Sequence, residues 1–182
     1  MVPDKTEIGI RRAVASDLEP LAALARKTYV DAFGRSFSAS DLKAHLKKNL
    51  SDERFAEFLR EDVFLIAQSP AEMIGFAQIG PAKAEDYPFG IGRDDQELRR
   101  IYVLKQRQGQ GVGGALLEAA LRLPASAAAR RIFLDVWEEN VSARRFYERR
   151  DFKLCGKRAF RTESGTATGF DLIMVRLKSA QP

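Results

Sequence analysis

The chain has few of the residues from which disulfides and structural metal sites are built: one cysteine, one histidine and one tryptophan in 182 residues. Cys155 cannot form an internal disulfide, and the lone His45 leaves no Cys/His cluster for zinc. No stretch approaches the ~20 apolar residues of a membrane span, and Met1 to Lys5 lacks the apolar core of a signal peptide. We therefore expect a cytoplasmic protein with no metal centre and no membrane partner.

The composition is that of a globular protein, with 45% apolar and 30% charged residues. At ~150 residues per domain, the length predicts a single domain over residues 1–182. The net charge of +5 favours a polyanionic ligand such as nucleic acid or a phosphorylated cofactor. The charges are either two solvated faces or a site for phosphates on one side and a cationic substrate on the other. Basic residues gather at 99–100, 105–107, 130–131 and 144–150, and acidic pairs at 85–86 and 94–95.

Apolar periodicity predicts strands and helices in alternation, and hence a mixed sheet with helices on both faces. Asp17, Ser51 and Asn140 are expected to cap helices, and Ser40 precedes another. Segment 80–95, with two prolines and three glycines, is too irregular for a regular element and is a candidate functional loop. Expected strands are 8–11, 63–67, 73–79, 98–104, 132–137, 152–160 and 170–177, and expected helices lie near 18–29, 42–46, 55–59, 112–123 and 142–149.

The strongest local signal is the glycine-rich turn Gln108 to Gly114, between an expected strand and an expected helix. Closely spaced glycines let backbone N–H groups converge on an anion at a helix N-terminus, where the helix dipole adds positive charge. The turn therefore predicts phosphate binding. A dinucleotide site, with Asp135 as the ribose acid, is disfavoured because only about seventy residues follow and Asp135 sits inside its strand. A P-loop is excluded because no Lys-Ser or Lys-Thr follows the glycines.

The same turn, as Q-x-x-G-x-G on Gln108, Gly111 and Gly113, closely resembles the acetyl-coenzyme A motif of the GNAT superfamily of N-acetyltransferases. The preceding segment 98–103 resembles that family's cofactor-pairing strand, and Asn140 to Tyr147 resembles its N-x-x-A-x-x-F-Y segment. The resemblance implies an α+β fold with a mixed, mostly antiparallel sheet of about seven strands. In that fold two splayed parallel strands form the cofactor cleft.

The resemblance further implies acetyl-CoA as co-substrate, with coenzyme A as product, and makes a homodimer a common assembly. A single buried face for Leu98, Ile101 and Val103 requires one extra residue near Arg99–Arg100, so a β-bulge is predicted there. Asp151 stands where the family usually has a glycine, and we expect it to adopt the left-handed conformation at modest cost. The implied cofactor-binding residues are Ile101, Tyr102, Val103, Gln108, Gly109, Gln110, Gly111, Val112, Gly113, Gly114, Asn140 and Tyr147.

Two residues are expected to carry the chemistry of direct transfer without a covalent intermediate. By resemblance Tyr147 is the general acid that protonates the leaving thiolate, although it could be a core aromatic instead. Glu97 matches the glutamate base of the histone-acetylating branch, with a solvated strand-end glutamate as the alternative. Cys155 is expected in the core and His45 on a helix surface.

The acceptor is expected to be a small amine or polyamine, because Asp31 to Gly34 looks like the polyamine and diamine branch. A protein N-terminus, a lysine or an amino sugar remains an alternative acceptor. Non-catalytic alternatives are an acyl-CoA sensor or a nucleic-acid-binding module, although nucleic acid is not the expected partner. Candidate substrate-lining residues are Tyr29, Phe33, Tyr87, Trp137 and Glu138.

Overall fold

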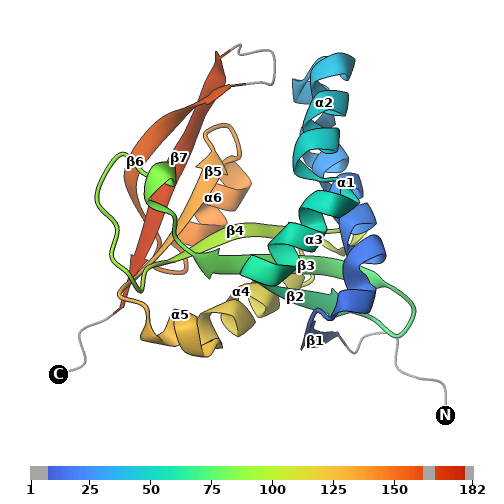
Figure 1. Ribbon diagram of the computed structural model, residues 1–182, viewed down its shortest axis with the longest axis horizontal. Helices are drawn as coiled ribbons and strands as arrows, with labels where there is room; N and C mark the ends of the chain where they lie inside the picture. Colours follow the sequence, from blue (N-terminus) through green and yellow to red (C-terminus); the bar gives the residue numbers. More distant parts are fainter. Residues whose placement is uncertain (1–7, 162–166, 179–182) are drawn as a thin grey trace. The chain divides into compact units, whose positions relative to one another are not determined.

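The computed structural model describes residues 8–161 and 167–178, which form a mixed α/β fold around a seven-stranded sheet (Figure 1). The strand order is β1-β2-β3-β4-β5-β7-β6, with β4 and β5 parallel and the other registered pairs antiparallel. The strands are β1 (Gly9–Arg12), β2 (Val63–Gln68), β3 (Met73–Pro81), β4 (Gln96–Val103), β5 (Arg131–Trp137), β6 (Lys153–Arg161) and β7 (Ala167–Leu177). The helices are α1 (Leu18–Phe33), α2 (Ala39–Asn49), α3 (Asp52–Glu61), α4 (Val112–Arg122), α5 (Pro124–Ala128) and α6 (Val141–Glu148).

The chain divides into two compact units, each built from two separate segments. The first unit comprises Met1–Ile79 and Arg100–Arg122, and the second comprises Gly80–Arg99 and Leu123–Pro182. Strand β4 contributes to both, because the boundary falls between Arg99 and Arg100. That the chain acts as one domain stays a prediction.

The first unit is built around an aromatic cluster that joins α3 to strands β2 and β3. Phe55 of α3 packs against Phe64 and Phe76, with ring centroids 5.7 and 6.4 Å away, and all three side chains are fully buried. Helix α4 packs against β1 and β2, and α1 packs against α3. The four central residues of β2 are all buried. Because alternate residues of a strand face opposite sides, both faces of β2 are therefore covered.

Gly75 of β3 is required by the close approach of β4 in this unit. A Cβ at Gly75 would lie 2.8 Å from the carbonyl oxygen of Tyr102 and 3.2 Å from a Val103 methyl group. The adjacent Leu104 N–H donates to the carbonyl of Ile74 at 2.9 Å. This glycine therefore positions the backbone of the strand end that carries three of the expected cofactor-binding residues.

In the second unit, strand register places several polar side chains on one face of β4, β5 and β7. Glu97 is paired with Phe133, and Asp135, two residues further along β5, faces the same side. Asp135 is in turn paired with Ile173 of β7. The loop after β3 covers this face, because Tyr87 packs with Phe133 and Ile173 in one buried cluster.

Two of the expected helix caps are confirmed, and the third holds the cap position without making a capping bond. Ser51 Oγ accepts from Arg54 N at 3.2 Å, and Asn140 Oδ1 accepts from Ala143 N at 3.1 Å. Asp17 precedes α1, but its side chain makes no cap bond, because it forms a bidentate ion pair with Arg11 and accepts from Val14 N. Helix α2 is capped by Ser38 instead of Ser40, since Asp41 N donates to Ser38 Oγ at 3.1 Å.

The expected left-handed residue after α6 is confirmed, since Asp151 has φ 65°. Its N–H donates to the carbonyl of Glu148 at 3.2 Å, and Phe152 N–H donates to that of Tyr147 at 3.2 Å, which closes the helix end. The other non-glycine residues that the structure describes avoid positive φ. The conformation is thus imposed by the helix end.

Replacing Asp151 by glycine is expected to raise the free energy of unfolding by about 0.5–1 kcal/mol, because glycine adopts positive φ without a steric penalty. Asp151→Ala should lower the free energy of unfolding by a similar amount. Urea unfolding would measure both. The matched control is Asp94→Gly, in an exposed loop without positive φ. If Asp151→Gly is no more stable than that control, the left-handed cap is not strained.

Candidate active site

The glycine-rich turn lies in the first unit and begins α4. Gly109 and Gly111 have φ of 76° and 81°, and a Cβ at either position would meet no atom within 4 Å. Backbone conformation, and not crowding within the chain, is therefore what requires glycine here. Gln108 Nε2 donates to the carbonyl of Val103 at 3.1 Å, which ties the turn to the end of β4. The turn is exposed, with its backbone open to a ligand at a helix N-terminus.

The second unit carries the other motif, in which Asn140 begins α6 and Tyr147 lies near its end. The half-buried Tyr147 ring packs edge-on against Phe146 and Phe152, at centroid distances of 5.0 and 5.7 Å. This packing is compatible with both interpretations of Tyr147, as a general acid and as a core aromatic residue. A catalytic role for Tyr147 stays a prediction.

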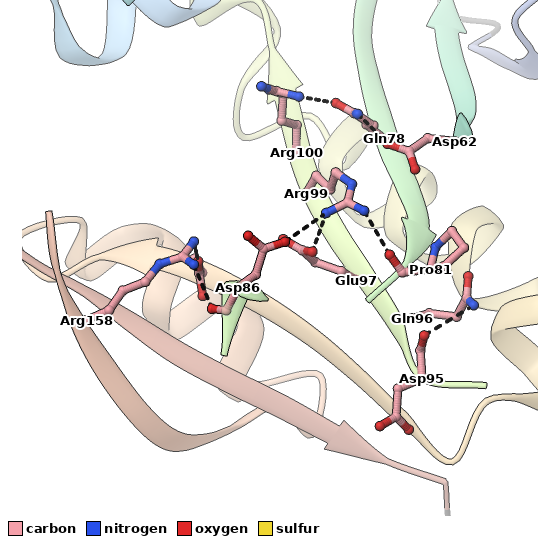
Figure 2. A network of polar contacts seen from close by, with 11 residues as sticks. Asp62, Gln78, Pro81, Asp86, Asp95, Gln96, Glu97, Arg99, Arg100 and Arg158 are labelled. Carbon is pink, nitrogen blue, oxygen red and sulfur yellow. Dashed lines mark hydrogen bonds and ion pairs between the residues drawn. The ribbon is translucent and has the colours of Figure 1, made fainter. Parts of the chain in front are cut away.

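Glu97 lies in a dry environment in the second unit, with an exposed fraction of 7%. Its carboxylate forms an ion pair with Arg99, which also donates to the carbonyl of Pro81 at 2.8 Å and approaches Asp86 at 4.0 Å (Figure 2). Burial raises the pKa of Glu97, and the nearby Arg99 guanidinium opposes that rise. The alternative of a solvated strand-end glutamate is wrong, because Gln96, Glu97 and Leu98 are all buried.

Asp135, which is half-buried, is a second carboxylate on the same face. Its Oδ2 pairs with Arg158 of β6, whose other nitrogen donates to the carbonyl of Asp86 at 2.8 Å. Burial raises the pKa of Asp135 to about 7, with Arg158 opposing the rise and Glu97 adding to it. Asp171 of β7 lies across from Arg158 in the register, and burial raises its pKa as well.

The structure distributes the expected substrate-lining residues over both units. In the first unit, Tyr29 contacts Phe33 at a centroid distance of 5.0 Å and stacks on His45 at 4.5 Å. In the second unit, Tyr87 is buried beside the carboxylates, and burial raises its pKa. Trp137 packs edge-on against Phe160 of β6, and Glu138 accepts from Phe170 N of β7 at 2.8 Å, so both side chains have structural contacts. Their contact with substrate stays a prediction.

Sequence reasoning missed Asp135 as a site residue and Arg158 entirely, and it misplaced two others. A charged residue inside the apolar run 132–136 was the available signal for Asp135. Cys155 is exposed and not in the core. It lies on β6, an edge strand of the sheet, where the register is irregular between Leu154 and Gly156. His45 is half-buried against Tyr29 and is not a plain surface residue.

The glycine turn before α4, the asparagine-capped α6 and the seven-stranded sheet agree with a family match. A model described as the acetyltransferase (GNAT) family matches residues 24–152, which include segments of both units. The chain belongs to the GNAT family of acetyltransferases. It is an N-acetyltransferase, and enzymes of this family use acetyl-CoA as co-substrate.

Relatives support the family over most of the chain. A protein of Mycobacterium tuberculosis, named an uncharacterised N-acetyltransferase, is 31% identical over 163 residues, which are 88% of this chain and 97% of its own. A Bacillus subtilis subsp. natto protein named a probable spermine N(1)-acetyltransferase is 32% identical over 93 residues, which are 50% of this chain and 60% of its own.

Solved structures of this GNAT fold confirm the predicted architecture of a mixed, mostly antiparallel sheet with one parallel pair. The PaiA N-acetyltransferase from Thermoplasma acidophilum, solved with coenzyme A, has a TM-score of 0.73 at 22% identity, covering 94% of this chain and 99% of its own. The ribosomal-protein-S18-alanine N-acetyltransferase from Escherichia coli has a TM-score of 0.67 at 21% identity, covering 97% of each chain.

None of the helices in residues 8–161 and 167–178 is long and apolar enough to cross a membrane. Over those same ranges, His, Cys, Asp and Glu side chains form no group of three or more that could hold a metal ion.

Substitution of Gly113 by valine is expected to weaken acetyl-CoA binding at least tenfold, about 1.4 kcal/mol. Gly113 lies in the first turn of α4, where a β-branched side chain would obstruct a ligand that approaches the backbone. Unlike Gly111, it does not have positive φ, so folding should tolerate the change. Isothermal titration calorimetry would measure the affinity, with Ala119→Val further along α4 as control. Equal affinities for the two folded variants would remove the turn from the cofactor site.

Proposed function

We propose that this enzyme transfers the acetyl group of acetyl-CoA directly to a primary amine of a small cationic substrate, such as a diamine or polyamine. The observation that carries the proposal is the buried Glu97. It lies on the face of the second unit that also carries Asp135 and Asp171, called the acidic face below. Acetyl-CoA and the amine are then its partners, without nucleic acid or membrane, and no metal is required.

Glu97 meets the main chemical difficulty of amine acetylation. An alkylammonium with a pKa near ~10 is about 99.9% protonated at neutral pH, a deficit of roughly 4 kcal/mol in free amine. A carboxylate whose pKa is raised by burial is a better proton acceptor near neutral pH than a solvated glutamate. In the proposed role Glu97 accepts the ammonium proton, directly or through one water, and Arg99 holds its carboxylate in place.

Tyr147 is proposed as the acid for the second half of the reaction. The free amine attacks the thioester carbonyl carbon, the C–N bond forms, and the C–S bond breaks as the thiolate leaves. That thiolate needs a proton, which a tyrosine hydroxyl can donate. The acetylated nitrogen then loses its extra proton to water, from which Tyr147 regains the proton it donates. The family's N-x-x-A-x-x-F-Y segment supplies the assignment, and the packing of the ring against Phe152 holds the side chain at the end of α6.

Carboxylates outnumber guanidinium groups on one face of the second unit, and this local excess favours a cationic acceptor. Four carboxylates on that face are opposed by two guanidinium groups, which leaves an excess of two acidic groups. The similarity to a probable spermine acetyltransferase over half the chain points the same way. The carboxylates belong to Asp86, Glu97, Asp135 and Asp171, and the guanidinium groups to Arg99 and Arg158.

A panel of acceptors tests the proposal most directly. Coenzyme A thiol release would be followed with monoamines, diamines, polyamines, amino sugars and peptides bearing a free N-terminus or a lysine. We expect the highest kcat/KM among small diamines and polyamines. Exclusive activity on peptides or amino sugars would overturn the acceptor class, and acetyl-CoA binding without turnover on any member would overturn the enzymatic proposal.

For Glu97→Gln, kcat/KM is expected to fall most at low pH and to recover as the pH approaches the pKa of the amine. The amide keeps the shape of the side chain but cannot accept the proton, and rising pH supplies free amine without a base. Steady-state rates from pH about 6 to about 9.5 would measure this. A uniform loss over that range would make Glu97 an electrostatic anchor, and no loss would remove it from the mechanism.

Tyr147→Phe is expected to lower kcat by roughly 10²-fold or more with little change in acetyl-CoA affinity, because general acid catalysis typically contributes ~10²–10⁴-fold. The ring contacts with Phe146 and Phe152 are kept, so the fold should be unaffected. A kcat within a factor of about two of the wild type would leave Tyr147 with a packing role alone.

A further inference from the structure

Two buried polar atoms on the loop-covered face of the second unit have no hydrogen-bond partner among the described residues. They are Oη of Tyr87 and Oδ1 of Asp135. Tyr87 is 7% exposed, and its hydroxyl lies close enough to Asp135 and Glu97 to feel both charges. Buried polar atoms are rarely left unsatisfied in folded proteins, so a missing donor or acceptor is indicated here.

The chemistry of these two atoms selects the kind of group that would satisfy them. Ionised Asp135 Oδ1 only accepts hydrogen bonds, and the Tyr87 hydroxyl can accept as well as donate. The surrounding carboxylate excess excludes an anion. The rings of Tyr87, Phe89 and Phe133 lie within 6 Å of one another and provide apolar and π surface beside the charge. An ammonium group on a short alkyl chain fits all of these features.

The position of Asp135 relative to Glu97 suggests which ammonium group this is. Glu97 is in register with Phe133, so Asp135 lies one strand across and two residues along. That offset corresponds to about 8 Å between the two Cα atoms. The two nitrogens of an extended five-carbon diamine are about 7 Å apart, from ordinary bond lengths. One ammonium can therefore reach Glu97 while the other reaches Asp135.

We infer that Asp135 Oδ1 and Tyr87 Oη bind the distal ammonium group of an α,ω-diamine or polyamine whose other amine is acetylated. This inference depends on the proposed amine acetylation and specifies its substrate. Asp135 is a binding residue in this arrangement, and Glu97 remains the proton acceptor. The remaining oxygen of Asp135 stays paired with Arg158.

Access to the two atoms is controlled by segment 80–95. Arg158 donates to the carbonyl of Asp86, which ties the middle of that segment to β6 (Figure 2). Tyr87 anchors the same part of the segment by packing against Phe133. Binding of a diamine requires this part of the segment to lift, and the new contacts to Tyr87 would then hold it closed over the ligand.

The test compares 1,5-diaminopentane with n-pentylamine, which have the same carbon chain and differ in one ammonium group. The wild-type enzyme should show at least tenfold higher kcat/KM for the diamine. Asp135→Asn should remove most of that preference by lowering kcat/KM for the diamine at least tenfold, with the monoamine changed less than about threefold. Tyr87→Phe should reduce the preference about threefold or more, since it loses one hydroxyl.

Asp95→Asn is the matched control, because it removes one buried negative charge from the second unit, paired with Arg131, without touching either unsatisfied atom. Its diamine preference should stay within about threefold of the wild type. An equal loss in Asp95→Asn and Asp135→Asn would overturn a specific site in favour of a general effect of negative charge. Equal kcat/KM for the two amines in the wild type would overturn the inference and leave amine acetylation standing, with a buried water as the occupant. No turnover of either amine, or of any in the panel, would overturn both.

The preference should also depend on pH. Asp135 is faced by Arg158, Glu97, Asp171 and Asp86, and its pKa is about 7. Because the carboxylate is ionised above its pKa, the ratio of diamine to monoamine kcat/KM should increase as pH rises through about 7. The ratio should be independent of pH in Asp135→Asn. A wild-type ratio that is flat from pH 6 to 8.5 would contradict the role of Asp135.

Discussion

The insertion of two arginine side chains among four carboxylates is the interaction on which the second unit depends. Arg99 links Glu97 to the end of β3, and Arg158 links Asp135 to the loop that follows β3. Each guanidinium satisfies a backbone carbonyl and a carboxylate at once, which a lysine could not do with the same planar geometry. The two arginines thereby join segment 80–95 to the strands of the acidic face by charge, in addition to the apolar packing.

Burial raises the pKa of both Glu97 and Asp135, but the two carboxylates are surrounded by different charges. Glu97 has a guanidinium on its own strand, two residues away, whereas Arg158 reaches Asp135 from another strand. The second carboxylate also experiences the negative charges of Glu97, Asp171 and Asp86, which favour its protonated form. Two carboxylates on one face can therefore take different tasks, one as proton acceptor and one as a binding group.

Much of the fold could be predicted because its signals are local. The glycine turn, the Asn140 cap and the left-handed Asp151 are each determined by a few neighbouring residues, and the structure has all three. The expected cap bond of Asp17 is absent because its carboxylate pairs with Arg11 instead. That pairing depends on β1 lying beside the start of the helix, which the local sequence does not show. Cys155 was misjudged because an irregular register decides its exposure.

The acidic face was the least predictable part, because it is assembled from strands far apart in sequence. Arg158 reads in sequence as one more charge in a basic chain, and only pairing with Asp135, 23 residues away, gives it a role. The irregularity of segment 80–95 made it a candidate functional loop, but its ring contacts with Phe133 depend on tertiary packing. Sequence motifs thus predict the cofactor turn, whereas the proposed acceptor side depends on strand register that only the three-dimensional structure gives.

Burying so many charges on one face needs a physical justification, because a buried ion pair is weak support for stability. Apolar side chains of similar size often stabilise a fold as much as or more than such pairs, since desolvation offsets the attraction. Here the carboxylates also outnumber the guanidinium groups, and Asp135 Oδ1 has no hydrogen-bond partner among the residues that the structure describes. Burying a carboxylate oxygen and a tyrosine hydroxyl without hydrogen-bond partners costs free energy of folding, so stability alone does not explain this face. The excess acidity is therefore best understood as a preformed environment for positive charge, which Arg99 and Arg158 neutralise in part and a substrate ammonium would complete.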